Sequence, residues 1–161
     1  MPAEAFAFSV PFRDLPPLVD EWRERTCVAK PSHGVPPHVT LLIPAPPDLA
    51  GAAEALASFG PFDVTFARLD RFPGTLWLAP EPSDPFVAMT RALVARFPDH
   101  APYEGLFKEI TPHLTVAQGE DSGAAETALR PLLPFGSPAA SVVLFEQVAP
   151  DQWRENAEFA L

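Results

Sequence analysis

The chain has 161 residues, a length that fits one domain rather than two. With 47% hydrophobic and 20% charged residues it is expected to be globular, with a core that needs no disulfide or metal. Eleven basic residues against 21 acidic ones give a net charge of -10, which excludes the broad basic face that a long nucleic-acid duplex requires. The single cysteine, Cys27, excludes an internal disulfide.

Neither a membrane span nor a secretion signal is predicted. No apolar run approaches the roughly 20 residues of a transmembrane helix. The first ten residues lack the basic region of a signal peptide and include Glu4. We therefore expect a cytoplasmic protein with no membrane partner.

The first half of the chain predicts the order strand, helix, strand, helix and hairpin. Phe6, Phe8 and Val10 alternate with smaller residues, which is typical of a strand over 4–10. A helical spacing of apolar residues follows Asp14, which we expect to open that helix. Beyond the Pro/Gly-rich loop 30–37, the pattern predicts a strand at 38–43, an Ala-rich helix from Asp48 to about 59, and a hairpin of strands 62–69 and 75–79.

The second half repeats much of this order. A helix is predicted from about 83 to 97, a strand at 113–118, a helix from 121 or 122 to about 133, and a hairpin at 142–148 and 153–159. An offset of 75 positions (113 − 38) places His38 on His113. The sequence thus predicts an α+β fold: one bilobal domain over 1–161, whose pseudo-symmetric lobes, roughly 1–80 and 81–161, each hold a small antiparallel or mixed sheet with helices outside and a cleft between them.

One short stretch of sequence occurs in both halves. It reads Pro-His-Val-Thr-Leu at 37–41 and Pro-His-Leu-Thr-Val at 112–116. With only 4 histidines in 161 residues, coincidence explains this poorly. Residues two apart in a strand point to the same face, so His38 and Thr40 share one face, as do His113 and Thr115. The intervening apolar residues are expected to face the core.

Two such polar faces, meeting across one cleft, suit phosphate-ester chemistry. A neutral imidazole can take a proton from the attacking hydroxyl or water, while an imidazolium gives one to the leaving oxygen. The hydroxyls of Thr40 and Thr115 can donate hydrogen bonds to the non-bridging oxygens. This mechanism needs neither a metal nor another cofactor.

The doubled motif resembles that of the 2H phosphoesterase superfamily, and most of all its 2′-5′ RNA ligase/cyclic phosphodiesterase branch. The resemblance implies that His38 and His113 form the acid/base pair and that Thr40 and Thr115 bind phosphate. It further implies opening of 2′,3′-cyclic phosphate ends to 2′-phosphates, with a nucleotide or short RNA end as partner. Several RNA-acting members carry a basic residue five places after the second histidine, where this chain has Gln118. We expect a monomer.

Most other aromatic, histidine and cysteine residues are expected to have structural or no specific roles, and two aromatic residues are candidates for binding. Tyr103 and Phe107, in the loop before the second motif, are candidates to stack on a base, although Phe107 equally suits the core. We assign Phe6, Phe8, Trp77 and Trp153 to the core, His33 and His100 to solvated loops, and Cys27 to a buried or incidental thiol. Zinc is not expected, because neither motif supplies a nearby third ligand.

Two other functions stay open beside hydrolysis. The cleft could serve a binding module that reads phosphorylated ends or a nucleotide with little turnover. It could also ligate RNA through 2′-5′ linkages, although a groove for two RNA ends would need more basic residues.

Overall fold

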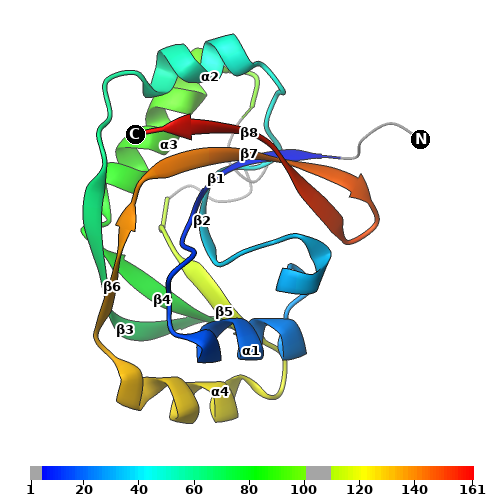
Figure 1. Ribbon diagram of the computed structural model, residues 1–161, viewed down its shortest axis with the longest axis vertical. Coiled ribbons are helices and arrows are strands. Elements are labelled where there is room, and N and C mark those ends of the chain that lie inside the picture. Colours follow the sequence, from blue (N-terminus) through cyan, green and yellow to red (C-terminus); the bar gives the residue numbers. More distant parts are fainter. Residues whose placement is uncertain (1–4, 101–109) are drawn as a thin grey trace.

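The computed structural model describes residues 5–100 and 110–161, and within them the strands form two four-stranded antiparallel sheets (Figure 1). Sheet A has the strand order β2-β1-β7-β8, and sheet B has the order β5-β4-β3-β6. Sheet A consists of β1 (Phe6–Pro11), β2 (His38–Leu42), β7 (Ser141–Ala149) and β8 (Gln152–Ala160). Sheet B consists of β3 (Phe62–Phe72), β4 (Thr75–Glu81), β5 (Leu114–Gln118) and β6 (Phe135–Ala139).

Four α-helices in the described residues cover the sheets: α1 (Pro17–Thr26), α2 (Leu49–Leu56), α3 (Asp84–Arg96) and α4 (Ser122–Leu129). Helix α1, which connects two strands of sheet A, contacts β5 and α4 on sheet B. Helix α3, which connects two strands of sheet B, contacts β2 and α2 on sheet A. In Figure 1 this places α1 and α4 together at one end of the molecule and α2 and α3 at the other. Among the helices described, none is long and apolar enough to cross a membrane.

The α+β fold with two sheets is confirmed, but the expected lobe boundary does not separate them. Sheet A takes β1 and β2 from the start of the chain and β7 and β8 from its end, while sheet B is built from the middle. A division near residue 80 would cut through β4. The repeated element order therefore relates equivalent positions in the two sheets. Neither sheet corresponds to one consecutive half of the chain.

Most expected elements are present, and the differences have local causes. Asp48 caps α2 as predicted, with its carboxylate accepting a hydrogen bond from the Gly51 amide at 2.9 Å. Asp14 does not open α1, which begins at Pro17. Its carboxylate instead accepts a hydrogen bond from the Ser137 hydroxyl of β6. Strand β6 was not predicted, because its sequence Phe-Gly-Ser-Pro-Ala is typical of a loop. Pro138 is tolerated there because β6 is an edge strand.

Aromatic rings join the two sheets through the core. Phe12, directly after β1, is 1% exposed, and its ring centroid lies 5.2 Å from that of Phe66 in β3, with the ring planes nearly perpendicular. Its ring also lies 6.5 Å from that of Phe86 in α3. Phe8, predicted in the core, is fully buried. Phe12 thus ties sheet A to sheet B and to one covering helix.

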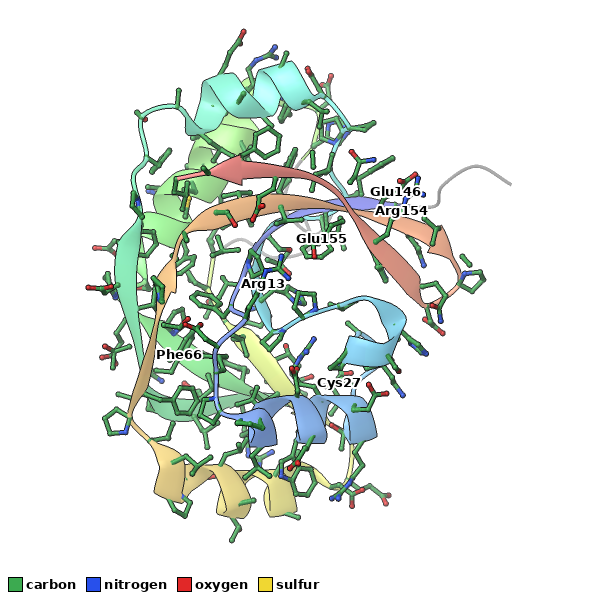
Figure 2. The ribbon with its side chains drawn as sticks, viewed as in Figure 1. Arg13, Cys27, Phe66, Glu146, Arg154 and Glu155 are labelled. Carbon is green, nitrogen blue, oxygen red and sulfur yellow. The ribbon has the colours of Figure 1, made fainter. Side chains whose placement is uncertain are left out.

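Ion pairs on the surface contribute little to this arrangement. Arg13 and Glu155 lie together on the outside of the molecule, with 2.8 Å between Nη2 and Oε1 (Figure 2). Both side chains are about half exposed, and such pairs typically contribute about 0–1 kcal/mol. This surface pair therefore adds little stability beside the apolar core.

We expect Phe12→Ala to lower the free energy of unfolding by about 3–5 kcal/mol, because a large buried ring between two sheets leaves a cavity. Urea denaturation followed by circular dichroism measures this loss. Leu132→Ala is the control: this side chain is 39% exposed, so its loss should stay within about 0.5 kcal/mol. Equal losses in the two variants would contradict the role given to Phe12.

Candidate active site

The two repeated motifs lie on strands at the inner edges of the two sheets. Strand β2, which begins with His38, is the edge strand of sheet A, and β5, which begins one residue after His113, is the edge strand of sheet B. The two strands contact each other where the sheets meet. His38 and His113, distant in sequence, are also close enough that the charge of His113 lowers the pKa of His38. The structure thus brings both motifs to one junction.

Each strand alternates as expected between the junction and the core. Val39, Leu41, Leu114 and Val116 are at most 2% exposed, whereas the histidines and threonines of both motifs are only partly buried. In β2, Thr40 pairs with Ser9 of β1. In β5, Thr115 pairs with Trp77 of β4.

A β-bulge follows the threonine in both strands at the same step. The pairing of β1 with β2 passes from Ser9–Thr40 to Phe8–Leu42, so one residue of β2 is left over. The pairing of β4 with β5 passes from Trp77–Thr115 to Leu76–Ala117, again leaving one residue over. A bulge re-aims the side chains on its strand. The two motifs therefore match in local backbone geometry as well as in sequence.

Both imidazoles are held through the same ring nitrogen. His38 Nδ1 lies 2.9 Å from the carbonyl oxygen of Pro36, and His113 Nδ1 lies 2.8 Å from that of Thr111. A carbonyl oxygen can only accept, so Nδ1 donates in both cases. A backbone bond of this kind fixes the tautomer of a neutral imidazole and leaves Nε2 as the acceptor. Within the described residues, Nε2 of neither histidine has a hydrogen-bond partner, so each is available for chemistry.

Aromatic side chains limit the orientation of both rings. The Phe145 ring of β7 lies 6.4 Å from the His38 ring. The His113 ring has Phe72 at 5.0 Å and Trp77 at 5.8 Å, both approaching edge to face. Trp77 is 4% exposed, as its assignment to the core predicts, and it also supports an imidazole of the candidate site.

The two imidazoles differ in their electrostatic surroundings. Burial lowers the pKa of His38 to about 4, aided by the positive charge of Arg23 and by His113, while the hydrogen bond to Pro36 opposes the shift. Burial also lowers the pKa of His113, opposed by the bond to Thr111, and no cation among the described residues contributes. The described surroundings of the two rings thus differ by the charge of Arg23, which acts on His38.

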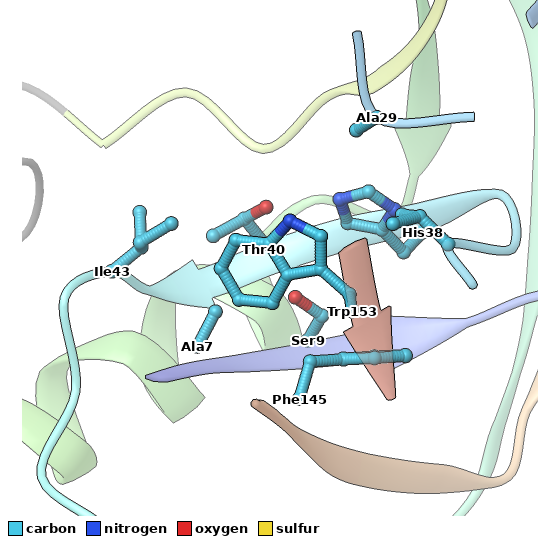
Figure 3. A pocket seen from close by; sticks show the side chains of 9 residues that line it. Ala7, Ser9, Ala29, His38, Thr40, Ile43, Phe145 and Trp153 are labelled. Carbon is cyan, nitrogen blue, oxygen red and sulfur yellow. The ribbon is translucent and has the colours of Figure 1, made fainter. Parts of the chain in front are cut away.

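A pocket opens beside His38 and Thr40 on the face of sheet A (Figure 3). Its wall is mainly apolar and includes Val35, Phe145 and Trp153. Trp153, which was assigned to the core, has the same sequence parity as Phe159. The register of β7 with β8 explains the difference: Leu144 pairs with Ala157 but Phe145 pairs with Glu155, so one extra residue of β8 reverses the alternation. Phe159 accordingly faces Phe8 in the core, whereas Trp153 lines the pocket.

A second hollow lies on the His113 side, against sheet B. It is lined in part by Arg68, Trp77 and Thr111, the residue whose carbonyl holds His113. Arg68 is paired with Asp70 at 2.8 Å, and both side chains are half exposed or more. The junction is thus flanked by an apolar pocket on one side and a more polar hollow on the other.

The other residues singled out from the sequence are not placed at the junction of the two motifs. Tyr103 and Phe107 lie outside the described residues. Gln118 has a structural role: its amide oxygen accepts from the Val28 amide at 3.0 Å, which fastens the segment after α1 to β5. Cys27 is buried at the end of α1, as expected. His33 is only half-buried, but its Nδ1 is buried without a hydrogen bond, so it is less solvated than predicted.

The described side chains offer no cluster of metal ligands. Within 5–100 and 110–161, no three His, Cys, Asp or Glu side chains gather as the ligands of a metal ion would. The polar groups at the junction are imidazoles and hydroxyls, which suit acid/base chemistry and hydrogen bonding to an anion.

Solved structures share this fold at low sequence identity. E. coli LigT in its apo form matches with a TM-score of 0.59 and 18% identity, covering 100% of this chain and 99% of that one. E. coli LigT complexed with NADP+ matches with a TM-score of 0.57 and 19% identity, at the same coverage. A crystal structure described as a phosphoesterase matches with a TM-score of 0.57 and 17% identity, covering 99% of each chain. No curated protein sequence matches this chain.

The sequence itself identifies the family. The family model of the 2′-5′ RNA ligase superfamily matches residues 11–149, a range that includes both motifs and six of the eight strands in full. The resemblance inferred from the repeated motif is thereby confirmed: this chain belongs to the 2′-5′ RNA ligase superfamily.

Proposed function

We propose that the protein is a metal-independent phosphodiesterase that opens 2′,3′-cyclic phosphate ends of nucleotides or short RNA to 2′-phosphates. The observation that carries this proposal is the pair of imidazoles at one junction, each with Nδ1 bonded to a backbone carbonyl, which leaves Nε2 as the proton acceptor. Such a pair can hold one proton between two rings, which is the state that simultaneous acid and base catalysis requires.

The reaction divides into one bond made and one broken. The neutral imidazole takes a proton from water through Nε2 as the water oxygen attacks phosphorus. The protonated imidazole gives its Nε2 proton to the 3′ oxygen as the bond from that oxygen to phosphorus breaks. Thr40 and Thr115 donate hydrogen bonds to the non-bridging oxygens, where negative charge gathers. Exchange with solvent then returns each imidazole to its starting state.

The charge of the chain favours a small substrate over a long one. A net charge of -10 supplies little attraction for an extended phosphate backbone. Gln118, at the position where RNA-acting relatives carry a basic residue, is engaged with the Val28 amide. Crystal structures of E. coli LigT contain 3′-AMP, ATP or NADP+, which supports a nucleotide as the ligand class. We therefore place hydrolysis of a nucleotide-sized end ahead of RNA ligation.

The pocket beside His38 suits the base of such a nucleotide. Trp153 and Phe145 provide aromatic surfaces next to the motif on sheet A, and Val35 completes an apolar wall. Aromatic stacking accepts any base, because every base has a flat π-face. In this proposal the base lies against sheet A while the phosphate lies between the two histidines.

We expect His38→Ala and His113→Ala each to lower kcat/KM by about 10² to 10⁴, since each removes one partner in proton transfer. Thr40→Val and Thr115→Val should each lower it by about 10², since each removes one donor to the charged oxygens. Turnover of 2′,3′-cyclic nucleotides in the presence of EDTA, with product isomers resolved by chromatography, measures these effects.

His100→Ala is the matched control for these variants, because it changes a histidine outside both motifs and should keep the wild-type rate. Near-wild-type turnover in either motif variant would overturn the acid/base assignment. Tight nucleotide binding by the wild-type protein without any product would identify a binding module, and formation of 2′-5′ linkages from RNA ends would identify a ligase.

The dependence of kcat/KM on pH should be bell-shaped with its maximum on the acidic side of neutral. As the pH falls through about 4, His38 becomes protonated and no imidazole is left to accept a proton. As the pH rises through the pKa of His113, which lies below the ordinary 6.5, no imidazole is left to donate one. Stopped assays across the pH range, with folding checked by circular dichroism, test this. An alkaline optimum would argue against the proposal.

Trp153→Ala should raise the KM for nucleoside 2′,3′-cyclic phosphates by about tenfold or more with little change in kcat, because stacking on one base is worth about 1–3 kcal/mol. Trp153→Phe should keep most of the affinity. Ribose 2′,3′-cyclic phosphate, which lacks the base, is the control substrate, and its KM should be the same in all three proteins. An equal rise in KM for both substrates would show that the base does not bind in this pocket.

A further inference from the structure

Arg23 in α1 is a charged side chain in the interior, with only 1% of its surface exposed. Arginine is almost never fully buried unless it is paired, since removing its charge from water is costly. Burial accordingly lowers its pKa, while Asp20, Cys27 and Glu24 act in the opposite direction. The contacts of the guanidinium must therefore offset the free energy of removing its charge from water.

The contacts of Arg23 are concentrated on the loop that leads to His38. Its Nη1 donates to the Asp20 carboxylate at 2.8 Å. Its Nη2 lies within hydrogen-bond distance of three backbone carbonyls of the loop, those of Ala29 at 3.0 Å, Val35 at 2.9 Å and Pro36 at 3.1 Å. One guanidinium thus forms hydrogen bonds to both ends of the segment between α1 and β2.

The Pro36 carbonyl oxygen links this arrangement to the candidate site. It accepts from Arg23 Nη2 at 3.1 Å and from His38 Nδ1 at 2.9 Å. A carbonyl oxygen has two lone pairs and can accept both bonds. Arg23 therefore fixes the group that orients His38, and its positive charge disfavours a second positive charge on that ring.

His113 has no such support among the described residues. Its Nδ1 donates to the Thr111 carbonyl, and no arginine or lysine in 5–100 or 110–161 contributes to its pKa. Among the described residues, the charged groups that act on His38 are Arg23 from α1 and His113, one residue before β5. Within the described part of the chain, two motifs that match in sequence and in backbone geometry thus differ by one buried cation.

We propose that Arg23 is a positioning residue that separates the roles of the two histidines, holding His38 neutral as the base and leaving His113 to carry the proton as the acid. The assignment of roles rests on the proposed phosphodiesterase function. In that reaction the proton of water passes to His38 Nε2, and the proton of His113 Nε2 passes to the leaving oxygen.

Two substitutions separate the charge of Arg23 from its hydrogen bonds. Arg23→Gln removes the charge but keeps an amide that can donate to a carbonyl, and Arg23→Lys keeps the charge but loses the planar fork. In Arg23→Gln the pKa of His38, followed by ¹⁵N-resolved NMR titration of the ligand-free protein, should rise by about one unit or more. The acid limb of the kcat/KM profile should move upward with it. In Arg23→Lys the titration should stay near that of the wild type.

Arg25→Gln is the matched control, because it removes an arginine from the same helix at a position where the side chain packs over Trp22. It should leave the His38 titration unchanged. Asp20→Asn provides a second test if the Arg23 variants do not fold. Asp20 is half exposed, so its substitution is expected to leave the fold intact. Without its carboxylate partner, Arg23 should lower the pKa of His38 further. A His38 titration unmoved in folded Arg23→Gln, or in Asp20→Asn, would overturn the role of Arg23.

A cyclic phosphate with sulfur as the leaving atom tests the roles directly, because a thiolate leaves without being protonated. His113→Ala should recover to within about tenfold of the wild-type rate on this substrate, as a variant that lacks only the general acid does. His38→Ala should remain inactive. The opposite pattern would overturn the role assignment. Absence of wild-type turnover on any cyclic phosphate, with the NMR shifts as expected, would instead refute the proposed function and leave the effect of Arg23 intact.

Discussion

The contact between two sheet edges is the constraint on which the candidate site depends. Strands β2 and β5 each pair on one side only, and the unpaired sides meet where sheet A adjoins sheet B. Edge strands are otherwise a liability, because their unpaired backbone groups invite pairing with other chains. Here the edges lie within the molecule, and the polar face of each strand is available for a ligand. The crossing of α1 and α3 to the opposite sheets holds these edges in place.

Much of this arrangement could be predicted from sequence, because the repeated motif marks both edge strands. Alternation placed Val39 and Leu114 in the core and the two histidines on the other face, as the structure has them. The strand order could not be predicted, since equivalent positions in a repeat do not reveal which strands pair. Consecutive lobes were therefore expected, whereas β7 and β8 return to complete the sheet that β1 and β2 begin.

Residues that sequence reasoning missed depend on register, which no local pattern reveals. Trp153 shares parity with Phe159 along the chain, and alternation alone places such residues on one face. One extra residue in β8 reverses the faces between them and moves Trp153 from the core to the pocket beside His38. Arg23 was hidden for a related reason. A helical arginine is usually solvated, and only the folded loop places the carbonyls of Val35 and Pro36 around its guanidinium.

Acid/base catalysis requires two histidines in different protonation states, which a fully symmetric site does not distinguish. Two identical imidazoles would compete for one proton, and half of the singly protonated molecules would hold it on the wrong ring. The backbone supplies the symmetric part, with matching bulges and matching Nδ1 bonds. The asymmetry comes from outside the motifs, through a cation on a helix that belongs in sequence to one sheet and packs against the other. A duplicated fold can thus acquire distinct acid and base positions without any change in the motifs themselves.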